Sequence, residues 1–191
     1  MKTINDLLIL DFKYDLRKSK NAKKGLIDLC NIINDKLGSN LNMVEIGSFS
    51  GVSGSIFSQF FYNVNCVDPW QNEYDKKDHA SDPNLFDMRE IENQFDDVSN
   101  IFTNIKKFKM TSLEASKLFE NNSLDFVYID GNHTYNFVKQ DIQIWLPKIK
   151  KSSLICGHDY QGRFQGTIDA VNELLGKPDK IFPDTSWIKF L

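Results

Sequence analysis

The sequence has little of what marks secreted, membrane-spanning or disulfide-linked proteins. Its 191 residues include only three cysteines, Cys30, Cys66 and Cys156, and no Cys-x-x-Cys or Cys/His spacing that would hold a structural zinc ion. The first residues lack the pattern of a signal peptide, and no apolar run approaches the roughly 18 residues of a transmembrane helix. We therefore expect a cytoplasmic protein with reduced thiols and no membrane partner.

Arginine and positive charge are also scarce. Only Arg17, Arg89 and Arg163 among the 23 basic residues are arginines, and the formal net charge is −3. A protein that clamps nucleic acid needs a cationic excess to neutralise phosphates, so we expect no nucleic-acid partner. The length and the 41% hydrophobic content fit one globular domain over residues 1–191 and leave open whether the chain forms a homo-oligomer.

Short apolar runs alternate with segments of helical periodicity along the chain. Residues 1–37 are predicted to be helical and Gly38 to end an N-terminal helical segment, 1–38, whereas the polar stretch 69–103 is interpreted as a substrate-side insertion. Strands are expected at 43–47, 64–68, 105–110, 124–129, 154–157, 180–182 and 187–191, and further helices at 52–61, 113–119, 135–145 and 168–175. This order predicts an α/β fold with a Rossmann-like, doubly wound, mostly parallel seven-stranded sheet and one antiparallel C-terminal strand.

Glycine or acidic residues follow the first two expected strands. Gly47 and Gly51 flank a turn that leads into a helix, and Asp68 closes the next strand. In parallel sheets ligands bind at the carboxyl ends of strands, where a glycine turn lets the backbone approach a cofactor and an acid accepts hydrogen bonds from ribose hydroxyls. The pair favours a nucleoside-type cofactor over a plain turn and a helix cap. Trp70, just after Asp68, is interpreted as a ring that stacks on adenine.

Two further acids follow strands that should be neighbours in the sheet. Asp130 and Asp159 end these strands, and His133 and His158 flank them. Paired carboxylates suit a divalent cation such as magnesium, and either histidine could exchange a proton near neutral pH. The same residues could instead cap the helices that follow.

These motifs together resemble those of class I S-adenosylmethionine-dependent methyltransferases. The run from Val44 to Gly51 looks like the first motif of that class, Asp68 looks like its ribose-binding acid, and Ser112 matches the usual adenine contact. The runs 129–135 and 157–160 are similar to small bacterial methyltransferases related to metal-dependent sugar O-methyltransferases and to the cephalosporin-hydroxylase-like group. The resemblance covers roughly residues 40–175.

The resemblance implies which residues contact each ligand. It implies cofactor contacts from Glu45, Gly47, Ser48, Gly51, Asp68, Trp70, Ser112 and Asp130, and magnesium ligands at Asp130, His158 and Asp159. His158 stands where the metal-dependent relatives have an acid, so it is either a ligand or a base in a metal-free reaction. Asp130, His133 and His158 are the candidate catalytic residues, and the expected reaction is O-methyl transfer to a small hydroxylated acceptor such as a sugar.

Two rival interpretations remain at this point. Gly47, Gly51 and Gly54 together with Tyr135-x-x-x-Lys139 imitate an NAD(P)-dependent oxidoreductase, although the glycine spacing differs and the tyrosine lies on the apolar stripe of its helix. A non-catalytic cofactor-binding protein is the other alternative. In the methyltransferase interpretation, the N-terminal segment, residues 69–103 and the loop after Asp159, including Arg163, select the acceptor.

Overall fold

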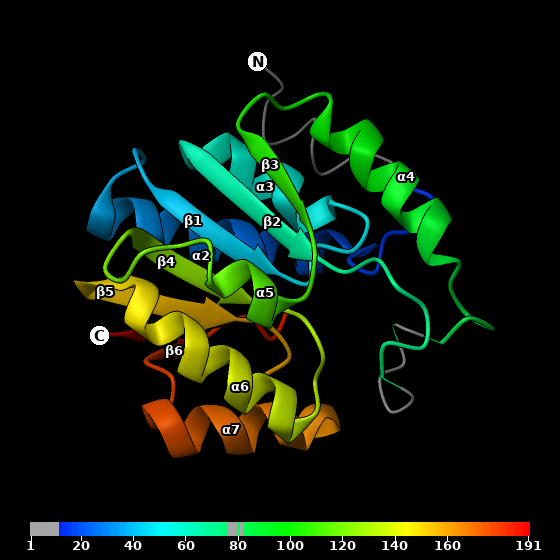
Figure 1. Ribbon diagram of the computed structural model, residues 1–191. Helices are drawn as coiled ribbons and strands as arrows, with labels where there is room; N and C mark the ends of the chain where they lie inside the picture. Colours follow the sequence, from blue (N-terminus) through cyan, green and yellow to red (C-terminus); the bar gives the residue numbers. More distant parts are fainter. Residues whose placement is uncertain (1–11, 76–79, 81) are drawn as a thin grey trace.

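A seven-stranded sheet forms the centre of the molecule in the computed structural model, which describes residues 12–75, 80 and 82–191 (Figure 1). The strand order is β3-β2-β1-β4-β5-β7-β6. The strands are β1 (Asn42–Ile46), β2 (Asn63–Asp68), β3 (Ile105–Lys109), β4 (Leu124–Ile129), β5 (Ile149–Gly157), β6 (Lys180–Ile181) and β7 (Trp187–Phe190). The first five run parallel and β7 is antiparallel to both of its neighbours, which confirms the predicted fold class.

Helices cover both faces of this sheet because each presents an apolar stripe. On one face, α2 (Lys20–Leu37), α3 (Val52–Phe60) and α4 (Met88–Ser99) bury residues against β1, β2 and β4. On the other, α5 (Ser112–Ser116), α6 (Tyr135–Trp145) and α7 (Gln165–Leu175) pack on the opposite side of the same strands (Figure 1). Val138, Ile142 and Trp145 of α6 show the spacing of three and four residues that the sequence predicts.

The N-terminal segment differs from its predicted form. Residues 1–11 lie outside the described residues, and the first described helix begins only at Lys20, where Ser19 accepts a hydrogen bond from the Ala22 N–H as its N-cap. The prediction of helix over residues 12–19 is therefore wrong. This segment instead carries Asp15 and Arg17 into buried ion pairs, which its local sequence pattern does not reveal.

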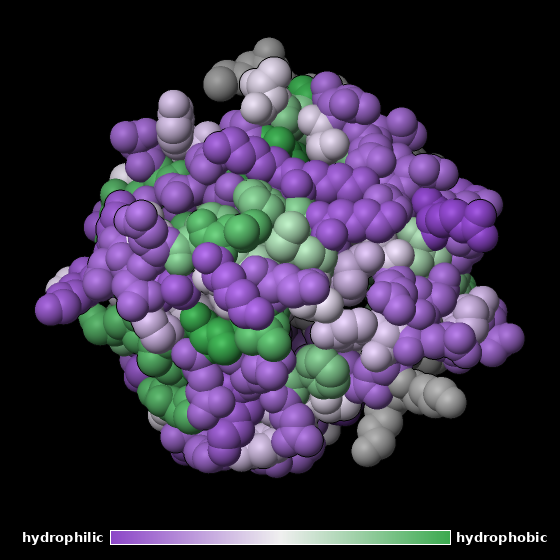
Figure 2. Space-filling model, in the orientation of Figure 1, coloured by the Kyte–Doolittle hydropathy of each residue, from purple (hydrophilic) through white to green (hydrophobic). Residues whose placement is uncertain are grey.

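The strand order reverses between β1 and β4, which are direct neighbours. Their carboxyl ends, with those of β2 and β5, meet at one edge of the sheet, so Gly47, Asp68, Asp130 and His158 all emerge there. The face in Figure 2 is largely hydrophilic, with hydrophobic side chains in separate small groups. Within the described residues, every helix is too short or too polar to cross a membrane.

Candidate active site

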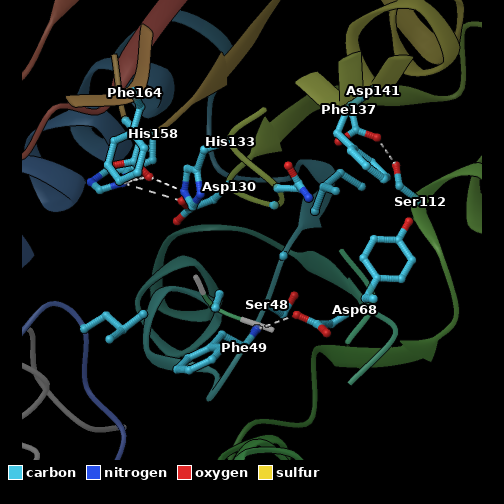
Figure 3. Close-up of a pocket in the computed structure, with 18 of the residues that line it drawn as sticks. Ser48, Phe49, Asp68, Ser112, Asp130, His133, Phe137, Asp141, His158 and Phe164 are labelled. Atoms are coloured by element: carbon cyan, nitrogen blue, oxygen red, sulfur yellow. Dashed lines mark hydrogen bonds and ion pairs between the residues drawn. The ribbon is translucent and has the colours of Figure 1, made fainter. Parts of the chain in front are cut away.

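A cavity of about 820 Å³ opens at the carboxyl edge of the sheet. Its volume lies within the range of small-molecule sites. Figure 3 shows Ser112, Phe137 and Asp141 at one end and a cluster of imidazole and carboxylate groups at the other, with Ser48, Phe49 and Asp68 below and between them. The end at Ser112, where the family resemblance places adenine, is called the purine end, and the cluster of Asp130, His133, His158 and Asp159 is called the His–Asp cluster.

The turn after β1 forms the floor of the cavity. Gly47 has φ of 85°, and a Cβ on it would lie 2.2 Å from the carbonyl oxygen of Asp130, so only glycine allows this turn to pass against the end of β4. The turn then brings the N–H of Phe49 to the Asp68 carboxylate, to which it donates at 3.0 Å. Gly47 and Ser48 line the cavity as the cofactor interpretation requires.

Asp68 is a buried carboxylate in the wall of the cavity. Its Oδ2 accepts from Phe49 and its Oδ1 accepts from the N–H of Trp70 at 2.7 Å. These two backbone donors fix the orientation of the carboxylate. The geometry suits a pair of vicinal hydroxyls, the role predicted for this residue.

Three of the predicted cofactor contacts do not line the cavity. Trp70 is 4% exposed, packs on Phe95 with ring centroids 4.7 Å apart and donates its indole N–H to the Phe49 carbonyl, so the interpretation that it stacks on adenine is wrong. Glu45 is completely buried beside Cys66, and burial raises its pKa to about 7. Gly51 starts α3 with φ of 83° and faces Phe95. All three residues therefore lie outside the lining of the cavity.

Two histidines share one carboxylate in the His–Asp cluster. Asp159 Oδ2 lies 2.6 Å from His133 Nε2 and 3.1 Å from His158 Nδ1. Asp159 has φ of 60°, a left-handed conformation that is costly for a non-glycine residue and is often found at functional sites. The His133 ring also stacks on Phe164, with centroids 4.4 Å apart. Both imidazoles are therefore held in fixed orientations.

Arg17 is a cavity residue that the sequence interpretation missed. Its Nη2 lies 2.7 Å from Asp130 Oδ2 and 2.8 Å from the Tyr128 hydroxyl, while its Nη1 lies 3.2 Å from Asp184 Oδ2. Arg17 is 7% exposed, so these charges are largely desolvated. The only sequence signal was that arginine is rare in this chain. The partners of the Arg17 guanidinium gave no local signal because they lie more than a hundred residues away.

The charges of the cluster hold one another in place. Burial and the nearby Arg17 disfavour a charged His158, but Asp130 and Asp159 outweigh both and raise its pKa to about 9. Burial also disfavours the Asp159 anion, yet hydrogen bonds from His133 and His158 hold its pKa below the usual range. At neutral pH, His158 is therefore an imidazolium beside ionised Asp159.

The His–Asp cluster has the ligand atoms of a candidate metal site, but its composition is not the one that magnesium prefers. The predicted ligands are Asp130, His158 and Asp159. Ligand atoms of Asp130, His133 and Asp159 lie within 4.8 Å of one another, and His158 Nδ1 lies 3.5 Å from Asp130 and 3.1 Å from Asp159. Magnesium prefers an octahedron of oxygen atoms. This set includes an imidazole nitrogen, and the Arg17 guanidinium already binds Asp130, where it would repel a second cation.

Asp141 and Phe137, both from α6, form much of the purine end together with Ser112. Asp141 is 4% exposed and accepts a hydrogen bond from the Ser112 hydroxyl. Burial raises the pKa of Asp141 to about 7, against the effect of that hydrogen bond. The sequence pattern places Asp141 between apolar positions of α6, which gave no sign that its carboxylate reaches the cavity.

The strand order, the glycine turn after β1 and the acid at the end of β2 agree with what the resemblance to class I S-adenosylmethionine-dependent methyltransferases implies. A family model described as a methyltransferase domain matches residues 44–160, more than half of the chain. The chain belongs to this family. Membership of this family favours the methyltransferase interpretation over the oxidoreductase alternative.

Known proteins similar to this chain are distant. Uncharacterized protein y4gI of Sinorhizobium fredii is 29% identical over 131 residues, which are 65% of this chain and only 14% of that protein. A tRNA methyltransferase, TrmI of Aquifex aeolicus, covers 100% of this chain and 76% of its own at 10% identity and TM-score 0.65. A putative caffeoyl-CoA O-methyltransferase of Staphylococcus aureus covers 86% and 81% at 16% identity and TM-score 0.60. At these identities the solved structures show the shared fold alone.

Proposed function

We propose that this methyltransferase transfers the methyl group to a hydroxyl oxygen of a small acceptor such as a sugar. The supporting observation is that a single cavity is lined both by Asp68 and by the His–Asp cluster (Figure 3). When bound, S-adenosylmethionine supplies an activated methyl group, so the chain must align an acceptor and manage its proton. A cluster of imidazoles and carboxylates beside the floor meets the second requirement.

His133 is the proposed base. Asp159 holds its Nε2 and so fixes the ring. His158 is protonated at neutral pH, with its Nδ1 beside Asp130 and Asp159, and therefore supplies positive charge near the acceptor oxygen rather than acting as the base. Asp130 holds both the His158 imidazolium and the Arg17 guanidinium in position. The hydroxyl thus loses its proton to His133 while the His158 imidazolium stabilises the developing negative charge.

The proposed reaction needs no magnesium. Arg17 and the His158 imidazolium already place two cations at the carboxylates that a metal would need. We also propose a cytoplasmic location, which the three buried cysteines, all free, support.

Three separate segments give the cavity its acceptor-side walls. They are the N-terminal segment with Leu16, the stretch after β2 with Phe86 and Met88, and the loop after Asp159 with Arg163. This mixed wall of apolar and polar side chains suits a small molecule with one or more hydroxyls, not an extended polyanion.

Calorimetry and a product assay test this proposal in sequence. The chain should bind S-adenosylhomocysteine and not NAD, and release of S-adenosylhomocysteine should identify an acceptor within a panel of hydroxylated sugars and phenols. His133→Gln should abolish release without changing cofactor affinity. Transfer that occurs only to amines or thiols, or full activity of His133→Gln, would overturn the proposed O-methyl transfer and the role of His133.

A further inference from the structure

Asp141 is a buried carboxylate that the proposed methyl transfer does not use. It lies in the cavity wall at the purine end, away from the His–Asp cluster (Figure 3). A buried carboxylate without a charged partner is costly, because burial disfavours its ionised form. Its position on the wall of a ligand cavity therefore calls for a role.

One oxygen of Asp141 is fixed by its neighbours. The indole N–H of Trp145 donates to the Ser112 hydroxyl oxygen at 2.8 Å, and that hydroxyl in turn donates to Asp141 Oδ1 at 2.5 Å. This chain of two hydrogen bonds sets the direction of every donor, because an indole N–H can only donate. The carboxylate plane is thereby held in one orientation.

The second oxygen of Asp141 faces the cavity. Oδ2 lies 3.9 Å from where a Cβ on Gly131 would stand, and Gly131 itself lines the cavity. Among the hydrogen bonds between described residues, none reaches this oxygen. The wall at the purine end thus presents one oriented acceptor.

The position of this acceptor matches one edge of a purine. If Asp68 holds the ribose hydroxyls, the base extends from the ribose toward Ser112, Phe137 and Asp141 (Figure 3). The ring nitrogens at the Watson–Crick and Hoogsteen edges of adenine are acceptors, and its exocyclic amine is the donor there. Above its pKa of about 7 the Asp141 carboxylate is ionised and only accepts hydrogen bonds, so at such pH it pairs with the amine and repels an oxo group at the same place.

We propose that Asp141 Oδ2 accepts a hydrogen bond from the exocyclic amine of the cofactor's adenine and makes the site selective for adenine over 6-oxopurines. The inference rests on the proposed function, since it needs an adenosyl ligand in this cavity. The amine also gives the buried carboxylate a donor, so ligand binding stabilises its ionised form.

Calorimetry with the unmodified chain gives the first test. The probes are S-adenosylhomocysteine and S-inosylhomocysteine, which differ by the exchange of the amine for an oxo group and a proton on the ring. A buried hydrogen bond to a charged group corresponds to about a 10- to 100-fold change in affinity. We expect the inosyl ligand to bind at least tenfold more weakly, and equal affinities would overturn the proposal even if the variants fail to fold.

Asp141→Asn tests whether Asp141 is the source of the preference for the adenosyl ligand. The amide can still accept from Ser112 through its oxygen, but it now presents an NH₂ group where Oδ2 stood. We expect affinity for the adenosyl ligand to fall about tenfold and the preference over the inosyl ligand to disappear or reverse. Asp169→Asn, the same change on the exposed side of α7, should leave both affinities as they are.

The outcomes separate this inference from the proposed function. A preference for the adenosyl ligand that survives Asp141→Asn, in a variant that melts like the unmodified chain, overturns the role of Asp141 alone. If the unmodified chain binds neither ligand, the cofactor assignment fails and the adenine contact fails with it.

Discussion

The floor of the cavity and the His–Asp cluster are built in different ways. The floor beneath the expected cofactor comes from the ends of β1 and β2, which pair side by side, and relies on the Gly47 turn and on backbone N–H groups that bind Asp68. The His–Asp cluster depends on side chains from distant segments, as in the contact between Arg17 and Asp130 across 113 residues. Binding of a common cofactor thus needs little more than local backbone geometry, whereas the proton chemistry needs long-range packing.

The largest expected effect is a loss of methyl-transfer rate when the His–Asp cluster is altered. His133→Gln removes the proposed base but retains a polar group beside Asp159, so the rate of methyl transfer should fall about 10²- to 10⁴-fold. Affinity for S-adenosylhomocysteine should stay within twofold, because the floor at Gly47 and Asp68 is untouched. Single-turnover kinetics and calorimetry measure the two quantities separately. A parallel loss of cofactor affinity would show that the floor of the cavity and the His–Asp cluster do not act independently.

The contrast between the floor and the His–Asp cluster also explains which features could be predicted from the sequence. The strand and helix pattern predicted α6 and β4 at their observed bounds, because their apolar periodicity is strong. Gly47 and Asp68 line the cavity as expected, because each lies at the carboxyl end of a strand that the sequence pattern predicts. Trp70 was misplaced because the sequence does not say toward which side the chain turns after Pro69; φ of 44° at Trp70 directs its ring onto Phe95.

Long-range partners account for the remaining errors. Nothing near Arg17 in the sequence indicates that its guanidinium meets Asp130 and Asp184, and these contacts hold residues 12–19 out of a helix. Asp141 stands in a helix whose pattern predicts only its buried face, and its contact with Ser112 joins two separate helices. Such contacts follow from tertiary packing, which periodicity does not encode.

The second prediction concerns the stability of the His–Asp cluster. Arg17→Gln leaves Asp130 and Asp184 without their buried cation, and breaking a buried ion pair from one side typically costs about 3–5 kcal/mol of unfolding free energy. Lys13→Gln removes an exposed partner of Glu90, whose ion pair is screened by solvent, and should cost clearly less than Arg17→Gln. Urea unfolding measures both. Equal losses would mean that Arg17 contributes no more than a surface charge.

A smaller effect should appear in the pH dependence of stability. Because the pKa of His158 rises from about 6.5 when unfolded to about 9 when folded, its contribution is complete below pH 6.5 and is lost as the pH rises through 9. The amount is about 1–3 kcal/mol, from the ion pairs with Asp130 and Asp159 opposed by burial and Arg17. The difference in unfolding free energy between the unmodified chain and His158→Gln should therefore shrink between pH 6.5 and 9. A constant difference would contradict an imidazolium at this position.

The smallest expected effect is that of removing divalent cations. If Arg17 and the His158 imidazolium supply the positive charge at Asp130 and Asp159, a chelator should leave the rate of methyl transfer within about twofold of its starting value. Manganese, whose paramagnetism reports binding directly, should bind the unmodified chain no more tightly than it binds Asp130→Asn. Arg17→Gln is the informative companion, since removal of the guanidinium frees Asp130 Oδ2 and should strengthen manganese binding if that variant stays folded. Loss of activity with chelator and recovery with magnesium would instead show that Asp130 binds a metal ion in place of the Arg17 guanidinium. The His–Asp cluster would then need a bound ion for its function, just as the floor of the cavity needs a bound cofactor.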